Sequence, residues 1–113
     1  MTCDVFEVVL VPFPFTDSNR SVSRPAVVLS RRGFNTQGHT VMAMITDQRN
    51  APWLLDVSID HLAVGLKMPS VVRMKFFTLD NRLVLRRIGR LPKTDRQELI
   101  KSLRQILPAD LAE

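Results

Sequence analysis

The stretch VFEVVLVPF, residues 5–13, indicates most directly how this chain folds. It is rich in β-branched and aromatic residues and carries a single charged side chain, Glu7, which is typical of a strand buried in a sheet. Pro12 and Pro14 mark its end, because proline cannot donate a hydrogen bond to a sheet ladder. Residues 16–23 are polar, and we predict a loop there.

Working outward from this strand, further short segments have the same β-favouring character and end at polar, glycine or proline residues. We predict strands at Pro25–Ser30, Thr40–Thr46, Leu54–Ile59, Ser70–Phe77 and Leu83–Leu91, and one helical turn at Asp60–Leu66. No internal repeat and no low-complexity segment interrupts this pattern. The short strands predict a sheet rather than a helical bundle.

The end of the chain changes to helical periodicity. Thr94–Gln97 fits a capping box, in which the Thr94 hydroxyl accepts from the Gln97 amide. Apolar residues then recur at helical spacing until Pro108, namely Leu99, Ile100, Leu103, Ile106 and Leu107. We predict a helix of roughly 14 residues with one packed face. Five or six strands and one helix predict an α+β protein, mostly β: a small barrel or strongly bent sheet with a covering helix.

Length and composition predict a single domain over residues 1–113. The only cysteine, Cys3, has no partner for an intrachain disulfide, which favours a reducing compartment. No apolar run is long enough to span a membrane, and the first residues lack the pattern of a signal peptide. We therefore expect a soluble, cytoplasmic protein with no membrane partner.

The charge of the chain is concentrated in one part of the sequence. The sequence contains sixteen Lys and Arg residues and eleven Asp and Glu residues, which gives a net charge of +5. Residues 67–90 hold seven of the basic side chains and only one acidic side chain, Asp80. If they share a face, they form a binding surface for a polyanion. The alternative is a solvated basic face without a partner.

Common catalytic motifs are absent from the sequence. It contains no glycine-rich phosphate loop, no His-Glu-x-x-His and no cysteine pair at zinc spacing, so we expect no metal and no cofactor. His39 and His61 are far apart, and each fits either a general base or an ordinary surface histidine. Motifs alone thus predict only a basic, β-rich domain that binds nucleic acid.

Three polar residues stand beside apolar strands. Arg24 precedes the second strand, Thr46 closes the third, and Arg73 interrupts the apolar segment Ser-Val-Val-Arg-Met. Each also has an ordinary interpretation. Arg24 fits a strand edge, Thr46 is favoured in strands anyway, and Arg73 fits the solvent side of a half-buried strand.

Several segments, in order along the chain, resemble those of the MazF/PemK/Kid toxins. They are Val9–Asp17, Arg24–Ser30, Phe34–Asn35, Ile45–Thr46, Gly65–Leu66, Pro69–Arg73, Phe77–Asp80 and Arg87–Leu91. Each piece is short, but the ordered set covers about residues 5 to 107. The resemblance implies an SH3-like barrel of the CcdB/Kid/MazF type with a C-terminal helix.

The resemblance also implies a function. Members are sequence-specific endoribonucleases that cleave single-stranded RNA, typically mRNA, by attack of the ribose 2′-hydroxyl, without a metal. They are usually homodimers, and a cognate antitoxin covers the RNA groove. Operator DNA is expected as a partner only of the complex with the antitoxin.

The site residues implied by the resemblance fall on named positions of this chain. The catalytic group is Arg24, Thr46 and Arg73, in which Arg24 stabilises the charged transition state and Thr46 orients the phosphate. The substrate-binding group is Phe15, Asp17, Lys75, Arg86 and Arg87. Strand alternation predicts that Arg73 and Lys75 point the same way and that Arg86 and Arg87 point oppositely.

The sequence departs from the family at three places. Phe6-Glu7 replaces a common Gly-Asp pair, Lys75 stands where some members carry Asp, and the first loop lacks a His found in others. The general base is therefore unassigned, with Asp17 as a substitute candidate. These departures leave two alternatives: a barrel that binds nucleic acid or a partner without cleaving, and a CcdB-like toxin acting on gyrase. The ending Asp-Leu-Ala-Glu disfavours the latter, because CcdB ends in Trp-Gly-Ile.

Overall fold

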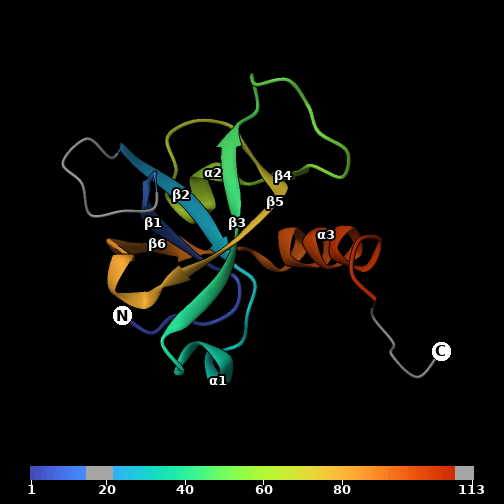
Figure 1. Ribbon diagram of the computed structural model, residues 1–113. Helices are drawn as coiled ribbons and strands as arrows, with labels where there is room; N and C mark the ends of the chain where they lie inside the picture. Colours follow the sequence, from blue (N-terminus) through green and yellow to red (C-terminus); the bar gives the residue numbers. More distant parts are fainter. Residues whose placement is uncertain (15–21, 109–113) are drawn as a thin grey trace.

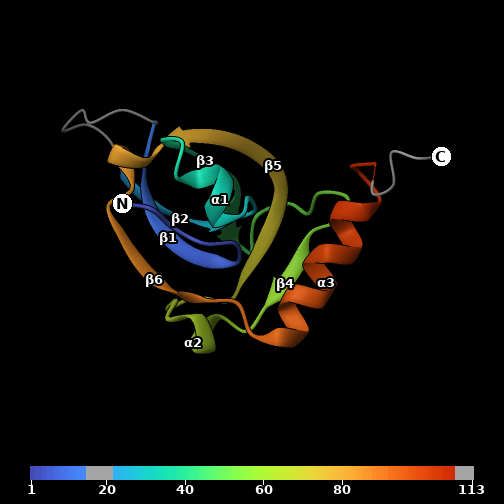
Figure 2. The same ribbon diagram turned by 90° about the horizontal axis from the view of Figure 1, so that it is seen from below.

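Six strands form one antiparallel sheet in this computed structural model, which describes residues 1–14 and 22–108. The strands are β1 (Glu7–Phe13), β2 (Val22–Val28), β3 (His39–Asp47), β4 (Val57–Ile59), β5 (Ser70–Asp80) and β6 (Arg86–Arg90). Their order across the sheet is β4-β5-β3-β2-β1-β6 (Figure 1). The sheet curls into a half-barrel (Figure 2), and this architecture confirms the mostly-β prediction.

Three helices and one 3₁₀ turn complete the described structure. They are α1 (Arg32–Asn35), α2 (His61–Val64), α3 (Lys93–Arg104) and η1 (Asn81–Leu83). Helix α3 lies against β4 on the outside of the curled sheet (Figure 2). Among the described residues, no helix is long and apolar enough to cross a membrane.

The predicted strands have different ends in the structure, and the largest changes are in β2, β4, β5 and β6. Strand β2 begins at Val22, so Arg24 lies inside the strand, opposite Val11 of β1, and does not open it. Strand β4 starts only at Val57, because Leu55 has a left-handed backbone with a φ of 68°. Strand β5 extends to Asp80, and β6 begins at Arg86 instead of Leu83, because Leu83 belongs to η1.

Both faces of the central strands are buried, which explains why β1 is apolar at almost every position. Val8 packs on one face with Leu99 of α3, in a cluster that includes Val27 and Ile45. The neighbouring Val9 packs on the other face, in a second cluster with partners from several elements. These partners are Cys3, Val11, Ala26, Val28, Met42, Leu79 and Val84.

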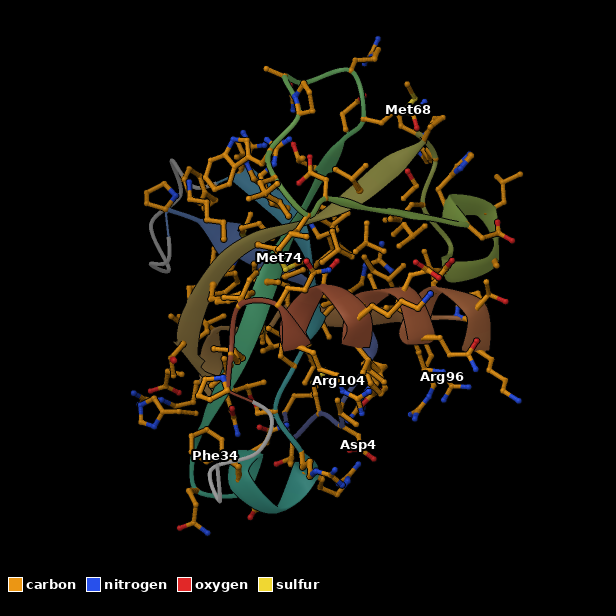
Figure 3. All side chains as sticks on the ribbon, turned by 90° about the vertical axis from the view of Figure 1, so that its right-hand side faces the viewer. Asp4, Phe34, Met68, Met74, Arg96 and Arg104 are labelled. Atoms are coloured by element: carbon orange, nitrogen blue, oxygen red, sulfur yellow. The ribbon has the colours of Figure 1, made fainter. Side chains whose placement is uncertain are left out.

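The predicted capping box at the start of α3 is wrong. The helix begins at Lys93, because the carbonyl of Pro92 already accepts from the amide of Arg96 at 3.0 Å. Thr94 therefore lies within the first turn, and no side chain caps the helix. Helix α3 has 12 residues and ends at Arg104, and Met74 of β5 lies above the helix in the view of Figure 3.

Helix α2 connects the two edges of the curled sheet and confirms the predicted helical turn at residues 60–66. It follows β4 directly and packs against β6 at Gly89. A Cβ atom at Gly89 would lie 2.5 Å from the carbonyl oxygen of Val64. Only glycine therefore permits this approach of helix and strand.

The departure at Phe6 coincides with a strained backbone. Phe6 has a φ of 69°, in the region that glycine adopts most readily. Its amide donates to Val28 at 2.8 Å and its carbonyl accepts from Leu91 at 3.0 Å, so neighbours on both sides fix it. The ring packs against the core and lies 6.0 Å from the Arg96 guanidinium. These contacts offset the cost of a non-glycine residue there.

Candidate active site

Two hollows share lining residues near the end of β3. There the chain leaves the sheet through the β3–β4 loop, residues 48–56 (Figure 1). The larger hollow, about 490 Å³, is lined by Val22, Ser23, Arg24, Pro25, Ile45, Thr46, Asp47, Asn50, Leu66, Lys67, Met68 and Ser70. The smaller hollow, about 250 Å³, is lined by Phe13, Arg24, Met44, Ile45, Thr46, Trp53, Arg73 and Lys75. The two hollows share Arg24, Ile45 and Thr46. Met68 marks this end of the molecule, far from Asp4 and Phe34 (Figure 3).

Arg24 occupies the boundary between the two hollows. Its side chain is exposed, and its guanidinium carbon lies 5.3 Å from the centre of the Phe13 ring. Within residues 1–14 and 22–108, Arg24 forms no ion pair, unlike Arg73. Its fork of N–H donors can therefore engage a phosphate between the hollows.

Thr46 lies beside Arg24 at the end of β3 and is half-buried. Its Oγ1 accepts a hydrogen bond from Nδ2 of Asn50 at 2.7 Å. A hydroxyl that accepts from one side still has its own proton to donate. Asn50 thus orients Thr46 so that its O–H can bind an anionic oxygen in the larger hollow.

Arg73 is buried in a network of contacts with the β3–β4 loop. Its Nε and Nη2 donate to the two carboxylate oxygens of Asp56 at 3.3 and 3.0 Å, and Nη2 also donates to the Ala51 carbonyl at 2.8 Å. The guanidinium lies 5.0 Å from the centre of the Trp53 ring. The interpretation of Arg73 as a solvent-facing residue is therefore wrong.

The Asp56 carboxylate is held in its charged form by this network. Burial raises the pKa of Asp56, but hydrogen bonds from the Arg73 side chain and the Trp53 amide outweigh that effect. The net pKa of Asp56 therefore lies below its ordinary value. Arg73 and Asp56 form a buried ion pair that ties the β3–β4 loop to β5.

An irregularity in strand β5 brings Arg73 and Lys75 to the same hollow. Ala43 of β3 pairs with Phe76, whereas Ile45 pairs with Val72, so three residues of β5 stand opposite Met44. Bulges of this kind redirect side chains, often beside functional sites. Both basic residues line the smaller hollow, in agreement with the prediction that they point the same way. Lys75 is exposed and forms no ion pair within the described parts of the chain.

Two other predicted substrate-binding residues, Arg86 and Arg87, do not line the two hollows. Arg86 and Arg87 lie on β6, which β1 separates from β2. The Nε of Arg87 is 2.9 Å from a carboxylate oxygen of Glu7, and its guanidinium also donates to the Thr2 carbonyl. Phe15 and Asp17 lie outside the described residues.

The described residues offer one carboxylate beside Thr46. Asp47 lines the larger hollow, but its carboxylate is 2.8 Å from Arg49. Hydrogen bonds from the Arg49 side chain and amide lower the pKa of Asp47, which makes it a weak base. His39 and His61 line neither hollow. In the part of the chain that the structure describes, no three His, Cys, Asp or Glu side chains gather to hold a metal ion.

Sequence reasoning missed two residues of this site, Trp53 and Asn50. Trp53 is 48% exposed, and it is the only tryptophan of the chain. A tryptophan within the polar stretch 47–53 was the available signal, since exposed aromatic residues in loops often bind ligands. Asn50 gave no such signal, because asparagine is common in loops for its turn-forming ability.

The protein is thus a small half-barrel with an arginine and a threonine between two hollows that lysines border. The family model of the PemK-like, MazF-like toxins of type II toxin–antitoxin systems matches residues 4–107. The chain therefore belongs to this family, and the resemblance seen in its sequence is confirmed.

Solved structures of this family have the same fold. The Mycobacterium tuberculosis toxin MazF-mt6 is 20% identical, with a TM-score of 0.74 over 92% of this chain and 98% of that one. MazF in a MazE–MazF complex of Deinococcus radiodurans is also 20% identical, with a TM-score of 0.77 over 97% and 100%. A mycobacterial endoribonuclease in complex with its cognate antitoxin is 12% identical, with a TM-score of 0.72 over 96% and 98%. A comparison with curated protein sequences finds no significant match.

Proposed function

We propose that this toxin is a sequence-specific endoribonuclease that cleaves single-stranded RNA at the junction of the two hollows. The observation that carries this proposal is the meeting of Arg24 and Thr46 there. Arg24 has no ion pair among the described residues, and the Thr46 hydroxyl is oriented by Asn50. The family and its structural neighbours, one of which is described as an endoribonuclease, support the same activity.

In the proposed reaction, the ribose 2′-oxygen attacks the adjacent phosphorus while the bond from phosphorus to the 5′-oxygen breaks. The products are a 2′,3′-cyclic phosphate and a 5′-hydroxyl. A base removes the proton of the 2′-hydroxyl, and an acid or water protonates the departing 5′-oxygen. Charge builds up on the non-bridging oxygens, where the Arg24 fork and the Thr46 hydroxyl stabilise it most in the transition state.

The roles of the remaining candidates follow from their contacts. Lys67 and Lys75 border the two hollows with exposed ammonium groups and would hold the phosphates on either side of the cut. A direct catalytic role of Arg73 stays a prediction, which its engagement with Asp56 disfavours. The general base stays unassigned, with Asp17 and Asp47 as candidates.

We further propose that the chain acts as a homodimer and is inhibited by a cognate antitoxin. Two of the structural neighbours are described as complexes with MazE or a cognate antitoxin. An antitoxin segment rich in Asp or Glu would imitate the phosphate chain in the hollows, so antitoxin and RNA would compete. A titration in which saturating antitoxin leaves RNA affinity unchanged would contradict a shared surface.

The test of the proposed activity is incubation of the purified protein with a long RNA in EDTA, followed by primer extension. We expect cuts at a short sequence, products that end in 2′,3′-cyclic phosphate, and no cut where the scissile ribose lacks its 2′-hydroxyl. Cutting that requires an added metal, or equal cutting of the deoxy-substituted strand, would refute the mechanism.

Substitutions assign the site within the same assay. Arg24→Ala should lower the cleavage rate at least about a hundredfold, the usual scale for one oxyanion-stabilising group, and Thr46→Ala should have a milder effect. Arg82→Ala is the matched control, because Arg82 is an exposed arginine that pairs with Asp80 and lines neither hollow. If Arg24→Ala cleaves at the wild-type rate, Arg24 is structural and the assignment fails.

A second candidate function is a barrel that binds RNA or an antitoxin without cleaving. The observation that favours it is the weak basicity of Asp47, which Arg49 holds in an ion pair. This function predicts tight RNA binding that survives Arg24→Ala, with no cyclic phosphate product at any enzyme concentration. Cleavage by the wild-type protein would exclude it.

A further inference from the structure

We propose that Trp53 is the residue on which an unpaired RNA base stacks, and that the Arg73–Asp56 pair positions it for this role. The inference rests on the proposed function and names the subsite that would read a base beside the cut. Trp53 lines the smaller hollow together with Arg24 and Thr46, so a base stacked there belongs to a nucleotide next to the scissile phosphate.

The indole ring of Trp53 is exposed although it is held in place. Trp53 is 48% exposed, while the Arg73 guanidinium lies 5.0 Å from its ring centre. Because Arg73 covers one face, the exposed area belongs to the other face and the ring edge. Aromatic side chains with a free face are the usual platforms for bases of single-stranded RNA.

Contacts within the loop and from two other elements, β5 and α3, fix the loop that carries Trp53. Its amide donates to Asp56 Oδ2 at 2.9 Å, and that carboxylate also accepts from Arg73 of β5. The Ala51 carbonyl accepts from Arg73 at 2.8 Å, and the Leu55 carbonyl accepts from Ser102 of α3 at 3.2 Å. A platform fixed before the ligand arrives loses little conformational entropy on binding.

The neighbouring loop residue does not share these features. Leu54 is 86% exposed and lines neither hollow. An exposed loop residue without a role in the site would resemble Leu54. Arg73 is therefore a positioning residue for Trp53 in this proposal, and Leu54 provides a matched control.

The composition of the chain gives a direct optical test. Trp53 is the only tryptophan and the chain has no tyrosine, so its near-ultraviolet emission reports on Trp53 alone. A fluorescein-labelled, mixed-sequence RNA of about 20 nucleotides with 2′-fluoro riboses cannot be cut and binds as a single strand. Anisotropy of the label measures binding, and emission of Trp53 measures contact with a base.

We expect Trp53 emission to be quenched over the same RNA concentrations that raise the anisotropy. Binding without any change in Trp53 emission would overturn this inference and leave the proposed function standing. An RNA that does not bind at all would overturn both. The two failures are therefore distinguishable in one titration.

Variants then separate stacking from a structural role of the loop. Trp53→Ala should weaken RNA affinity about tenfold or more, the scale of base–aromatic stacking, whereas Trp53→Phe should retain most of it and Leu54→Ala all of it. Replacing one nucleotide after another with an abasic site should reveal one position where wild-type affinity falls and Trp53→Ala affinity does not. Equal sensitivity of both proteins at every position would refute the stacking assignment.

The positioning role of the ion pair has its own readout. Asp56→Asn removes the charge partner of Arg73 and should let Trp53 rotate, which lowers the anisotropy of its emission in the free protein. In a cut-site map of a long RNA, Asp56→Asn should relax the base preference at the position that Trp53→Ala relaxes. Unchanged Trp53 anisotropy and unchanged preference in Asp56→Asn would show that the pair does not position the ring.

Discussion

The buried Arg73–Asp56 ion pair predicts a large stability effect for a loop substitution. Asp56→Ala removes the partner of a guanidinium whose side chain is only 10% exposed. Loss of one partner from a buried pair costs about 3–5 kcal/mol, because the other charge stays desolvated and unpaired. Arg73 keeps the Ala51 carbonyl and the Trp53 ring, so we expect the lower end, about 3 kcal/mol, in the free energy of unfolding.

Urea unfolding and thermal melts measure this loss. For a domain of this size, about 3 kcal/mol corresponds to a fall in Tm of roughly 12 °C. The midpoint should move while the slope of free energy against urea concentration stays constant, since the exposed area on unfolding is unchanged. Arg49→Ala is the matched control, because it breaks an arginine–aspartate pair of similar geometry whose arginine is 75% exposed. That variant should melt almost like the wild type.

A double-mutant cycle tests whether the Arg73–Asp56 pair is desolvated. Arg73→Met should also destabilise, since it leaves the Asp56 carboxylate buried without its partner. Combined with Asp56→Ala, it should cost much less than the sum of the two single effects, because no unpaired charge is left. The pair is not desolvated if the two losses in free energy of unfolding are additive. The same conclusion follows if Asp56→Ala loses less than about 1 kcal/mol.

Three further predictions follow from individual contacts. Gly89→Ala should destabilise by about 2 kcal/mol through its clash with the Val64 carbonyl, as read from urea unfolding, whereas Gly33→Ala, with nothing within 4 Å, should not. Because the folded pKa of Asp56 is lowered, its stabilisation is present above about pH 4 and disappears as pH falls through the folded pKa, so wild type and Asp56→Ala should converge in acid-unfolding curves. Lys75→Ala should reduce the slope of log RNA affinity against log salt concentration by about 0.7, whereas Arg86→Ala should leave that slope unchanged. An equal reduction of the slope in both variants would show that the bound RNA extends to β6.

The strands were predictable because a strand that is buried on both faces is apolar at nearly every position. Residues 5–13 read as a buried strand, and β1 occupies most of them. The failures lie where local signals compete with tertiary contacts. The capping-box pattern at Thr94 is not used, because α3 begins at Lys93, and the side chain of Asp95 instead accepts from the Asp60 amide at 2.9 Å. Sequence alone cannot show which of two adjacent starts the rest of the fold selects.

The site was predictable only in part, and for a physical reason. The resemblance placed Arg24 and Thr46 in the site, and both line the two hollows. The role of Arg73 depends on its ion pair with Asp56. The two residues are 17 positions apart in the sequence, and only the fold brings them into contact. The role of Trp53 depends on the same contact between Arg73 and Asp56, which hold the ring and the amide of Trp53. A residue whose role is set by a partner on another element carries no local signal of that role.

The basic segment 67–90 illustrates how the fold redistributes charge. Its seven cations do not share one face: Arg82 pairs with Asp80 at 2.8 Å, Arg87 pairs with Glu7, and Arg73 anchors the β3–β4 loop. Lys67, Arg73 and Lys75 of this segment line the hollows, but Arg73 is paired with Asp56. Lys67 and Lys75 form no ion pair among the described residues, and Arg24 from β2 joins them there. Positive charge that is already paired contributes little field to an incoming phosphate chain, whereas unpaired cations beside a hollow contribute most. The net charge of the sequence therefore predicts a polyanion partner, but the pairing of each cation determines where that partner binds.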